Sequence, residues 1–251
     1  MIILEWVATG RHEDGHWTGN LWESKDDCRT LQGPIEMTMD LPNAKKMSDD
    51  SGRPSIGICF HRSLLELPNV DLLTTVYGAF KEDTTPVTYQ PKMMKMRCVL
   101  LRSSDRGRFW QYASTIAVDP KVGQEGFDEP VMIRLSKGPK AGRLICLMRT
   151  GRDTHLYQAH SDDDGTTWSV SRELDFFGVD PDLVEMFDGT LVGSFVWMND
   201  GENPRYGRWS SYASLAEIEP GRLLALYDVV PDGWKGSVRY VASREIKFPS
   251  Q

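Results

Sequence analysis

The sequence predicts an all-β protein, organised as a β-propeller of four-stranded antiparallel blades. Three observations lead to this fold class. An apolar run, a turn and a second apolar run recur four times, a pattern of Ser, Asp, Gly and Trp within eight residues occurs twice, and no long segment has the periodicity of an amphipathic helix. Repeats of roughly 40 to 50 residues with four strands each are typical of propellers.

The repeated unit is a hairpin. In each copy a β-compatible run meets Pro, Gly, Asn or Asp and is followed by a second run that starts at a leucine, which is the pattern of a tight antiparallel connection. The four copies are residues 62–78, 130–151, 181–197 and 211–229. Because their spacing is uneven, insertions and deletions are expected in loops or outer strands.

Outer strands are predicted for two of the four copies. Residues 95–105 and 109–118 continue the first hairpin, and residues 156–162 and 168–174 continue the second. The third copy is followed only by a polar segment, residues 198–210, so its blade is predicted to be truncated.

We expect one propeller domain over residues 1–251, with five to six blades and a ring that can be incomplete. The clear blade repeats lie within residues 56–251. Residues 1–55 lack the hairpin unit, but residues 18–39 are compatible with two strands that would add to a blade or close the ring.

Composition excludes several classes of protein. The net charge of −7 is spread along the chain without a basic cluster, which argues against nucleic-acid binding, and no apolar run reaches the ~20 residues of a membrane span. The four cysteines are far apart without a CxxC pair, so mostly buried thiols are expected. The first residues lack the features of a signal peptide, which leaves the cytoplasm or secretion with a leader outside this sequence as the two expected locations.

The eight-residue pattern is expected to form a structural turn. It reads "SDDDGTTW" at residues 161–168 and "SSDRGRFW" at residues 103–110, and a degraded version is found at residues 24–31. Aspartate can accept backbone N–H groups across a turn, glycine permits a positive φ, and tryptophan can pack on the neighbouring sheet. A calcium loop would need alternating oxygen ligands ending in a glutamate, so no metal is predicted here.

This pattern is similar to the Asp-box, or BNR repeat. Together with the hairpins it makes residues 62–230 resemble the sialidase (neuraminidase) superfamily of β-propellers. The Asp-box occurs in propellers of many functions and therefore indicates fold more than chemistry. The resemblance implies three arginines that bind the substrate carboxylate, a tyrosine nucleophile polarised by a glutamate, and an aspartate that acts as acid and base.

The first hairpin and the loop after it carry two of these residues by resemblance. Arg62 opens the first inner strand, in the place of the first carboxylate-binding arginine, although the usual proline is absent. Asp83 follows the hairpin, in the place of the acid/base aspartate, and the adjacent Glu82 is an alternative. A surface arginine and solvated loop acids are the structural alternatives.

The later hairpins carry the remaining residues of the set. Glu129 and Arg149 stand at paired strand ends, which suits a base and a carboxylate-binding arginine, and Tyr212 matches the nucleophile. For the third arginine the sequence offers only Arg205 and Arg208, close before Tyr212. The family's catalytic domains are generally longer and have one more blade before the glutamate.

The leading hypothesis is a sialidase-like retaining glycoside hydrolase. It would cleave a terminal carboxylated sugar, sialic acid or similar, from a glycan, with no metal or organic cofactor. A propeller glycosidase or lyase that acts on uronic acids and a non-catalytic glycan-binding propeller are the alternatives, and the oligomeric state is open. The segment His12–His16 matches the zinc motif HExxH, but Gly15 and the lack of helical periodicity argue against a zinc site.

Overall fold

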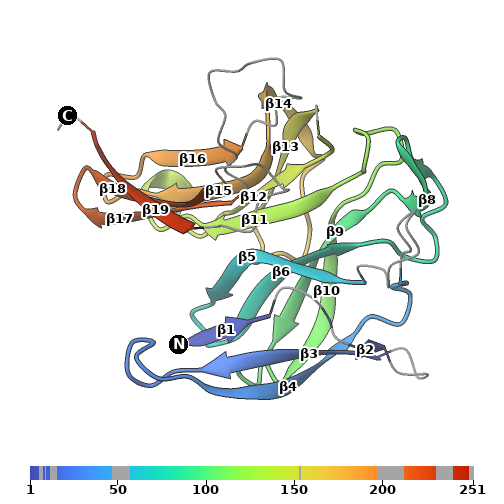
Figure 1. Ribbon diagram of the computed structural model, residues 1–251, viewed down its shortest axis with the longest axis horizontal. Helices are drawn as coiled ribbons and strands as arrows, with labels where there is room; N and C mark the ends of the chain where they lie inside the picture. The colour runs from blue at the N-terminus through green and yellow to red at the C-terminus, as the bar shows by residue number, and fades with distance from the viewer. Residues whose placement is uncertain are drawn as a thin grey trace.

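The computed structural model describes residues 1–5, 8, 10–11, 16–46, 57–152, 154–196, 212–229 and 240–248. The described secondary structure consists of β-strands and one 3₁₀ turn, η1 (Gly138–Lys140). The strands form one eight-stranded sheet, which contains the N-terminal strands, and several smaller sheets, and Figure 1 shows the later sheets beside it. The predicted all-β propeller fold is confirmed.

The first blade contains four antiparallel strands. They are β5 (Cys59–Glu66), β6 (Leu72–Gly78), β9 (Arg97–Ser103) and β10 (Phe109–Ala117). The N-terminal strands extend this sheet, because β4 pairs in parallel with β10. These N-terminal strands are β1 (Ile2–Leu4), β2 (Gly10–Arg11), β3 (His16–Glu23) and β4 (Gln32–Asp40). A small separate ribbon joins β7 (Pro86–Val87) and β8 (Gln90–Met94).

Three further sheets follow the first blade. One has four strands, β11 (Asp128–Arg134), β12 (Leu144–Arg149), β13 (His155–Ser161) and β14 (Arg172–Phe177). The next has two in the described residues, β15 (Val179–Glu185) and β16 (Leu191–Val196). The last has three, β17 (Ala213–Glu219), β18 (Arg222–Val229) and β19 (Tyr240–Lys247). All four predicted hairpins are therefore present, and the third lacks outer strands in the part of the chain described.

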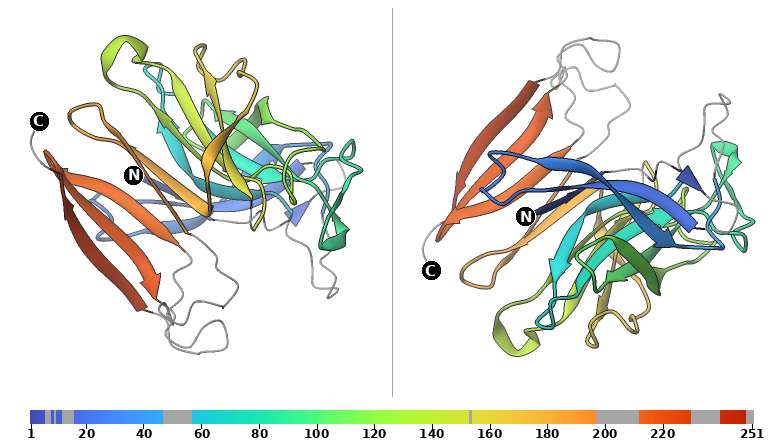
Figure 2. Two further views of the ribbon diagram at one scale, coloured as in Figure 1. Left: turned by 90° about the horizontal axis from the view of Figure 1, so that it is seen from above. Right: turned by 90° about the horizontal axis from the view of Figure 1, so that it is seen from below.

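The inner strands of these sheets are neighbours in the order β5, β11, β15 and β17. Figure 1 shows β5 between the N-terminal strands on one side and the three later sheets on the other. Figure 2 shows that the sheet β17–β19 forms one end of the molecule. Side chains from separate blades can therefore meet where the inner strands come together.

The repeated motif forms the same turn at each of its positions. The Ser103 hydroxyl accepts the N–H of Gly107 at 2.8 Å, and the Ser161 hydroxyl accepts that of Gly165 at 2.9 Å. The degraded copy repeats the bond from Cys28 to Ser24 at 2.8 Å. Both glycines have φ near 84°, a value that costs little without a Cβ, whereas Cys28 adopts φ 62° with a side chain.

One outer strand differs from its expected bounds. The sequence predicts a strand over residues 168–174, whereas β14 begins at Arg172. The indole of Trp168 donates to the Ser114 hydroxyl at 3.0 Å, and the N–H of Ser169 donates to His160. These residues complete the motif's turn, so the strand can begin only after them.

The core contains most of the cysteines, as the sequence predicts. Cys59, Cys98 and Cys146 are buried thiols in one apolar cluster between the first two blades, and Cys28 is exposed. Among the described residues, no helix is long and apolar enough to cross a membrane. In the same part of the chain no group of three His, Cys, Asp or Glu side chains is placed to bind a metal ion. Most of the segment 12–16 lies outside the described residues.

Candidate functional site

Three neighbouring inner strands carry a non-glycine residue in the left-handed region. Arg62 on β5 has φ 49°, Glu129 on β11 has φ 40°, and Asp180 on β15 has φ 52°. Each lies where the pairing with the next strand is irregular. Such positions cost on the order of 1–3 kcal/mol each and tend to occur at functional sites. Their repetition at one place in three strands marks a candidate site.

The irregularity in β5 is supported by the next strand. Thr75 Oγ1 donates to the carbonyl of His61 at 3.0 Å, and Thr74 Oγ1 donates to the carbonyl of Ser63 at 2.6 Å. Buried carbonyls that lose their ladder partner need another donor, and threonine supplies it here. The Ser63 hydroxyl also accepts the N–H of Met132 at 2.6 Å, which ties β5 to β11.

Asp180 connects the three strained residues. Its carboxylate accepts hydrogen bonds from Arg62 Nε at 3.1 Å and Arg62 Nη2 at 2.5 Å, and its backbone N–H donates to Glu129 Oε2 at 2.7 Å. His61 Nε2 lies 3.0 Å from Asp180 Oδ1, and its Nδ1 lies 3.1 Å from the carbonyl of Pro130. Both imidazole nitrogens therefore lie within hydrogen-bond distance of an oxygen of another strand.

Arg149, at the end of β12, is surrounded by acids. Its Nη1 donates to Glu129 Oε1 at 2.8 Å, its Nη2 lies 3.0 Å from Glu125, and its Nε lies 3.7 Å from Asp128 Oδ1. Asp128 is 2% exposed, and burial raises the pKa of this carboxyl well above its usual value although Arg149 opposes the shift. Arg149 therefore orients Glu129 and neutralises a buried acidic group.

Tyr212 directly precedes β17 and stands beside this network. Its backbone N–H donates to Asp228 Oδ1 at 2.8 Å, and its side chain is 45% exposed. Partial burial, followed by the charges of Glu129 and Asp180, raises the pKa of the phenol. The phenol is therefore protonated at neutral pH and lies within electrostatic reach of the carboxylates on β11 and β15.

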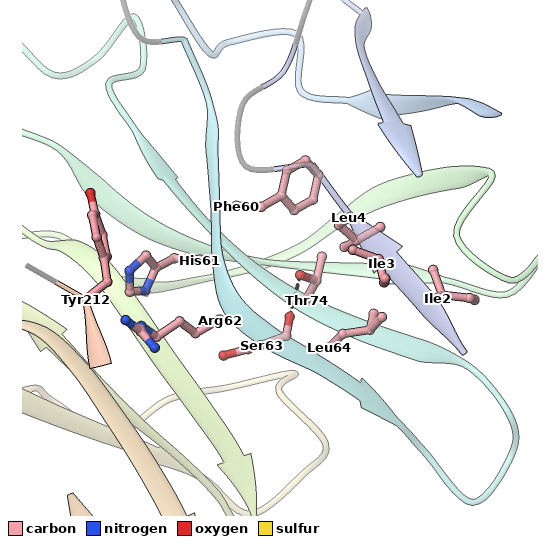
Figure 3. Close-up of a pocket in the computed structure, with 10 residues that line it drawn as sticks. All are labelled: Ile2, Ile3, Leu4, Phe60, His61, Arg62, Ser63, Leu64, Thr74 and Tyr212. Carbon is pink, nitrogen blue, oxygen red and sulfur yellow. Dashed lines mark hydrogen bonds between the residues drawn. The ribbon is translucent and has the colours of Figure 1, made fainter. Parts of the chain in front are cut away.

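A cavity of about 610 Å³ opens beside these residues. Figure 3 shows Tyr212, His61 and Arg62 together at one end of it and the β1 side chains Ile2, Ile3 and Leu4 at the other. Its size lies in the range of small-ligand sites, which combine apolar walls with a few polar groups. The cavity provides a space that a sugar-sized ligand could fill.

The structure places Asp83 in a separate set of contacts. Its carboxylate accepts hydrogen bonds from Arg97 Nε at 2.9 Å, from Arg97 Nη2 at 2.5 Å and from the backbone N–H of Phe80 at 2.8 Å. Glu82 lies 4.0 Å from Arg97 and lines a second cavity. Thus Glu129 pairs with Arg149, and Asp180 links Arg62 to Glu129, whereas the carboxylate of Asp83 contacts the base of its own loop. Tyr212 lines the same cavity as Arg62.

The two remaining arginines, Arg205 and Arg208, lie outside the described residues. Sequence reasoning missed four acids of the cluster, which are Glu125, Asp128, Asp180 and Asp182. A signal for Asp180 was available, because the second and third hairpins both begin at a proline that follows an acid, Glu129-Pro130 and Asp180-Pro181. Aligning these hairpins places Asp180 at the position of Glu129.

Comparisons with known proteins give a fold. No family model matches the sequence, and a search of curated proteins found no match. Among solved structures, a protein of unknown function from Dyadobacter fermentans is similar, with TM-score 0.64, 19% identity, and coverage of 92% of this chain and 64% of that one. A Hadza microbial sialidase has TM-score 0.57 and 13% identity over 92% of this chain and 44% of its own.

A leech intramolecular trans-sialidase has TM-score 0.53 and 16% identity over 91% of this chain and 36% of its own. The chain has a sialidase-like fold. At these identities the likeness speaks for fold alone, and this chain spans less than half the length of either sialidase. Within the sialidase-like fold, Arg62, Glu129 and Asp180 lie at irregular positions of three inner strands, and Arg149 lies at the end of β12.

The chemistry available in this cluster is mainly electrostatic. Five carboxyl groups, those of Glu125, Asp128, Glu129, Asp180 and Asp182, surround two guanidinium groups and His61. An arrangement of this kind favours positive charge on a bound group. Tyr212 adds an uncharged phenol to the lining of the cavity.

Proposed function

We propose that the chain is the catalytic part of a retaining glycoside hydrolase that removes a terminal sugar from a glycan. The observation that carries the proposal is the network that joins Arg62, through Asp180, to Glu129 and Arg149, next to a cavity that Arg62 and Tyr212 line. Arg62, Asp180 and Glu129 are held in strained backbone conformations. The likeness of the fold to sialidases supports the class of reaction.

In the proposed reaction, Tyr212 attacks the anomeric carbon. Because its surroundings raise the pKa of the phenol, attack requires a base, and the Glu129 carboxylate is the base assigned by the resemblance. The carbon–oxygen bond to the leaving group breaks as the Tyr212 ether bond forms, and water later cleaves this intermediate with retention of configuration. Arg149 holds the Glu129 carboxylate in place through its 2.8 Å bond.

The identity of the acid and of the sugar rests on the resemblance. It assigns the leaving-group proton to Asp83, and it favours a carboxylated sugar such as sialic acid held by Arg62, Arg149 and one of Arg205 and Arg208. The ion pairs already formed by Arg62 and Arg149 weigh against that sugar class. A tyrosine nucleophile remains suitable, because the negative charge that disfavours a carboxylate nucleophile is supplied here by the protein.

A panel of fluorogenic glycosides tests the proposal. Sialosides, uronides and neutral glycosides are offered to the wild type and to Tyr212→Phe, with Tyr89→Phe as a matched control at an exposed tyrosine on another loop. We expect kcat/KM for the best substrate to fall at least ~100-fold in Tyr212→Phe and less than ~2-fold in the control. Equal turnover by Tyr212→Phe would exclude the tyrosine mechanism, and no turnover of any glycoside would contradict the hydrolase.

A further inference from the structure

The guanidinium of Arg62 has a protein acceptor at each of its three nitrogens. Nε and Nη2 bind the two oxygens of Asp180 at 3.1 and 2.5 Å, and Nη1 donates to the Ser214 hydroxyl at 2.8 Å. Two parallel N–H···O bonds are the geometry in which arginine receives a carboxylate. The place that a substrate carboxylate would take on Arg62 is therefore filled by Asp180.

The fold holds Asp180 in this place. Its side chain is 2% exposed, its backbone N–H is bound by Glu129, and His61 contacts the same carboxylate. A carboxylate built into the chain competes with a dissolved one at a high effective concentration. Displacing it would leave a buried charge without its partner, a change that costs far more than a surface ion pair is worth.

Arg149, the second arginine predicted to bind a substrate carboxylate, is also occupied by acids of the protein. Arg149 faces Glu125, Asp128 and Glu129, and only 16% of its side chain is exposed. Among the described residues of the cluster, even without the buried Asp128, the four carboxyl groups of Glu125, Glu129, Asp180 and Asp182 outnumber the two guanidinium groups. A negatively charged sugar would therefore enter a site whose own charge is already negative.

We propose that Asp180 is a specificity-determining residue that occupies Arg62 in place of a substrate carboxylate, so that the cavity takes sugars without a carboxylate and rejects sialosides and uronides. This inference rests on the proposed function, because it concerns the sugar bound at the same site. It assigns Asp180 a role in selecting the substrate, separate from the chemistry of Tyr212 and Glu129.

Matched sugar pairs test the inference on the wild-type protein. Dissociation constants are measured by calorimetry for methyl glucoside against methyl glucuronide, methyl galactoside against methyl galacturonide, and the methyl glycoside of sialic acid against its carboxamide. Within each pair the ligands differ mainly in the carboxylate. We expect the uncharged member of at least one pair to bind at least ~10-fold more tightly than its acid, and no acid to bind more tightly than its partner.

The outcomes separate this inference from the proposed function. Tighter binding of an acid than of its uncharged partner overturns the role of Asp180 and leaves the hydrolase standing. If no sugar in any pair binds and no glycoside is turned over, both proposals fail. Turnover of sialosides in preference to all neutral glycosides overturns only the specificity assignment.

A charge-removing variant tests Asp180 directly. In Asp180→Asn the ratio of acid to uncharged affinity should rise about 10-fold, because Arg62 loses its competing carboxylate. Asp182→Asn is the matched control, since Asp182 lies on the same strand but 3.9 Å from Arg62 without the paired bonds, and its ratio should rise less than ~3-fold. Equal rises in the two variants overturn the assignment. Thermal unfolding verifies that each variant is folded. If Asp180→Asn does not fold, the matched sugar pairs measured on the wild-type protein decide the inference.

Discussion

Two arginine–aspartate pairs of the molecule have nearly the same local geometry and different settings. Arg97 and Asp83 are 14 residues apart, and the pair fastens a loop to the strand that follows it. Arg62 and Asp180 are 118 residues apart, join two blades, and both have positive φ. An arginine–aspartate ion pair fastens a loop locally in the first case and belongs to a strained long-range network in the second. Backbone strain and sequence separation, rather than the ion pair itself, distinguish the candidate site.

The largest predicted difference between the two regions is in catalysis. Glu129→Gln removes the proposed base and should lower kcat by ~10²–10⁴ with a smaller change in KM, because the proton of Tyr212 has no acceptor. Asp83→Asn should lower kcat less than ~10-fold if its pair with Arg97 only fastens the loop. A loss in Asp83→Asn as large as that in Glu129→Gln would instead support the acid role that the resemblance assigns to Asp83, and it would break the comparison.

Asp83→Asn should affect the stability of the fold strongly, although its expected effect on kcat is small. Asp83 accepts three hydrogen bonds and its side chain is 9% exposed, so Asp83→Asn should destabilise the fold by about 2–3 kcal/mol in urea unfolding. Glu82→Gln, 4.0 Å from Arg97 and mostly exposed, is the control and should change stability by less than ~0.5 kcal/mol. Equal effects of the two substitutions would contradict the role of this pair in fastening the loop.

The pH dependence of stability separates the network from the turn motif. Burial raises the pKa of Asp128, so the folded state holds that proton more tightly than the unfolded state and its stabilising effect is lost as pH rises above ~4. Asp163 behaves oppositely, because bonds from the Thr167 backbone and side chain lower its pKa to about 2, so its contribution is present above pH ~4 and lost on acidification toward 2.

Asp128→Asn should therefore stabilise the protein relative to the wild type by an amount that grows between pH 4 and 7. Asp163→Asn should destabilise it at pH 7 and approach the wild type near pH 2. Urea midpoints across this range measure both trends. A pH-independent difference for Asp128→Asn would mean that the pKa of this carboxyl is the same in the folded and unfolded states.

The smallest expected effect concerns strain away from the site. Cys28 has φ 62° in a turn where the other two copies have glycine, so Cys28→Gly should stabilise the protein by about 0.5–1 kcal/mol and leave activity unchanged. Gly165→Ala is the opposite case, because a Cβ would lie 2.1 Å from Leu100, and it should destabilise the fold. If Cys28→Gly altered kcat, strain in the turns and strain at the site would not be separable.

The regular part of the fold could be predicted from the sequence. Local patterns, such as the apolar runs of 130–151 and the motif at residues 103–110, predict hairpins and turns, and the structure contains them. Glu129 and Arg149 could also be placed together, because they end paired strands. The contact of Arg62 with Asp180 could not, because it joins blades 118 residues apart and depends on bulges that no local pattern encodes. The pairing of Asp83 with Arg97 was missed because an acid in a loop and a basic residue at the start of the next strand, 14 residues later, are too common to be specific.

The most direct test of the account is covalent trapping of the proposed intermediate. The protein is incubated with fluorinated glycosyl fluorides of neutral sugars and of sialic acid, and its peptides are analysed by mass spectrometry. Cleavage after Arg208 and Arg222 gives a peptide whose single tyrosine is Tyr212, together with two glutamates. We predict one sugar per chain, attached to Tyr212 and derived from a neutral fluoride. A sugar attached to Glu129 or Asp180 instead would contradict the tyrosine mechanism, and turnover of a glycoside without any trapped adduct would contradict the covalent route.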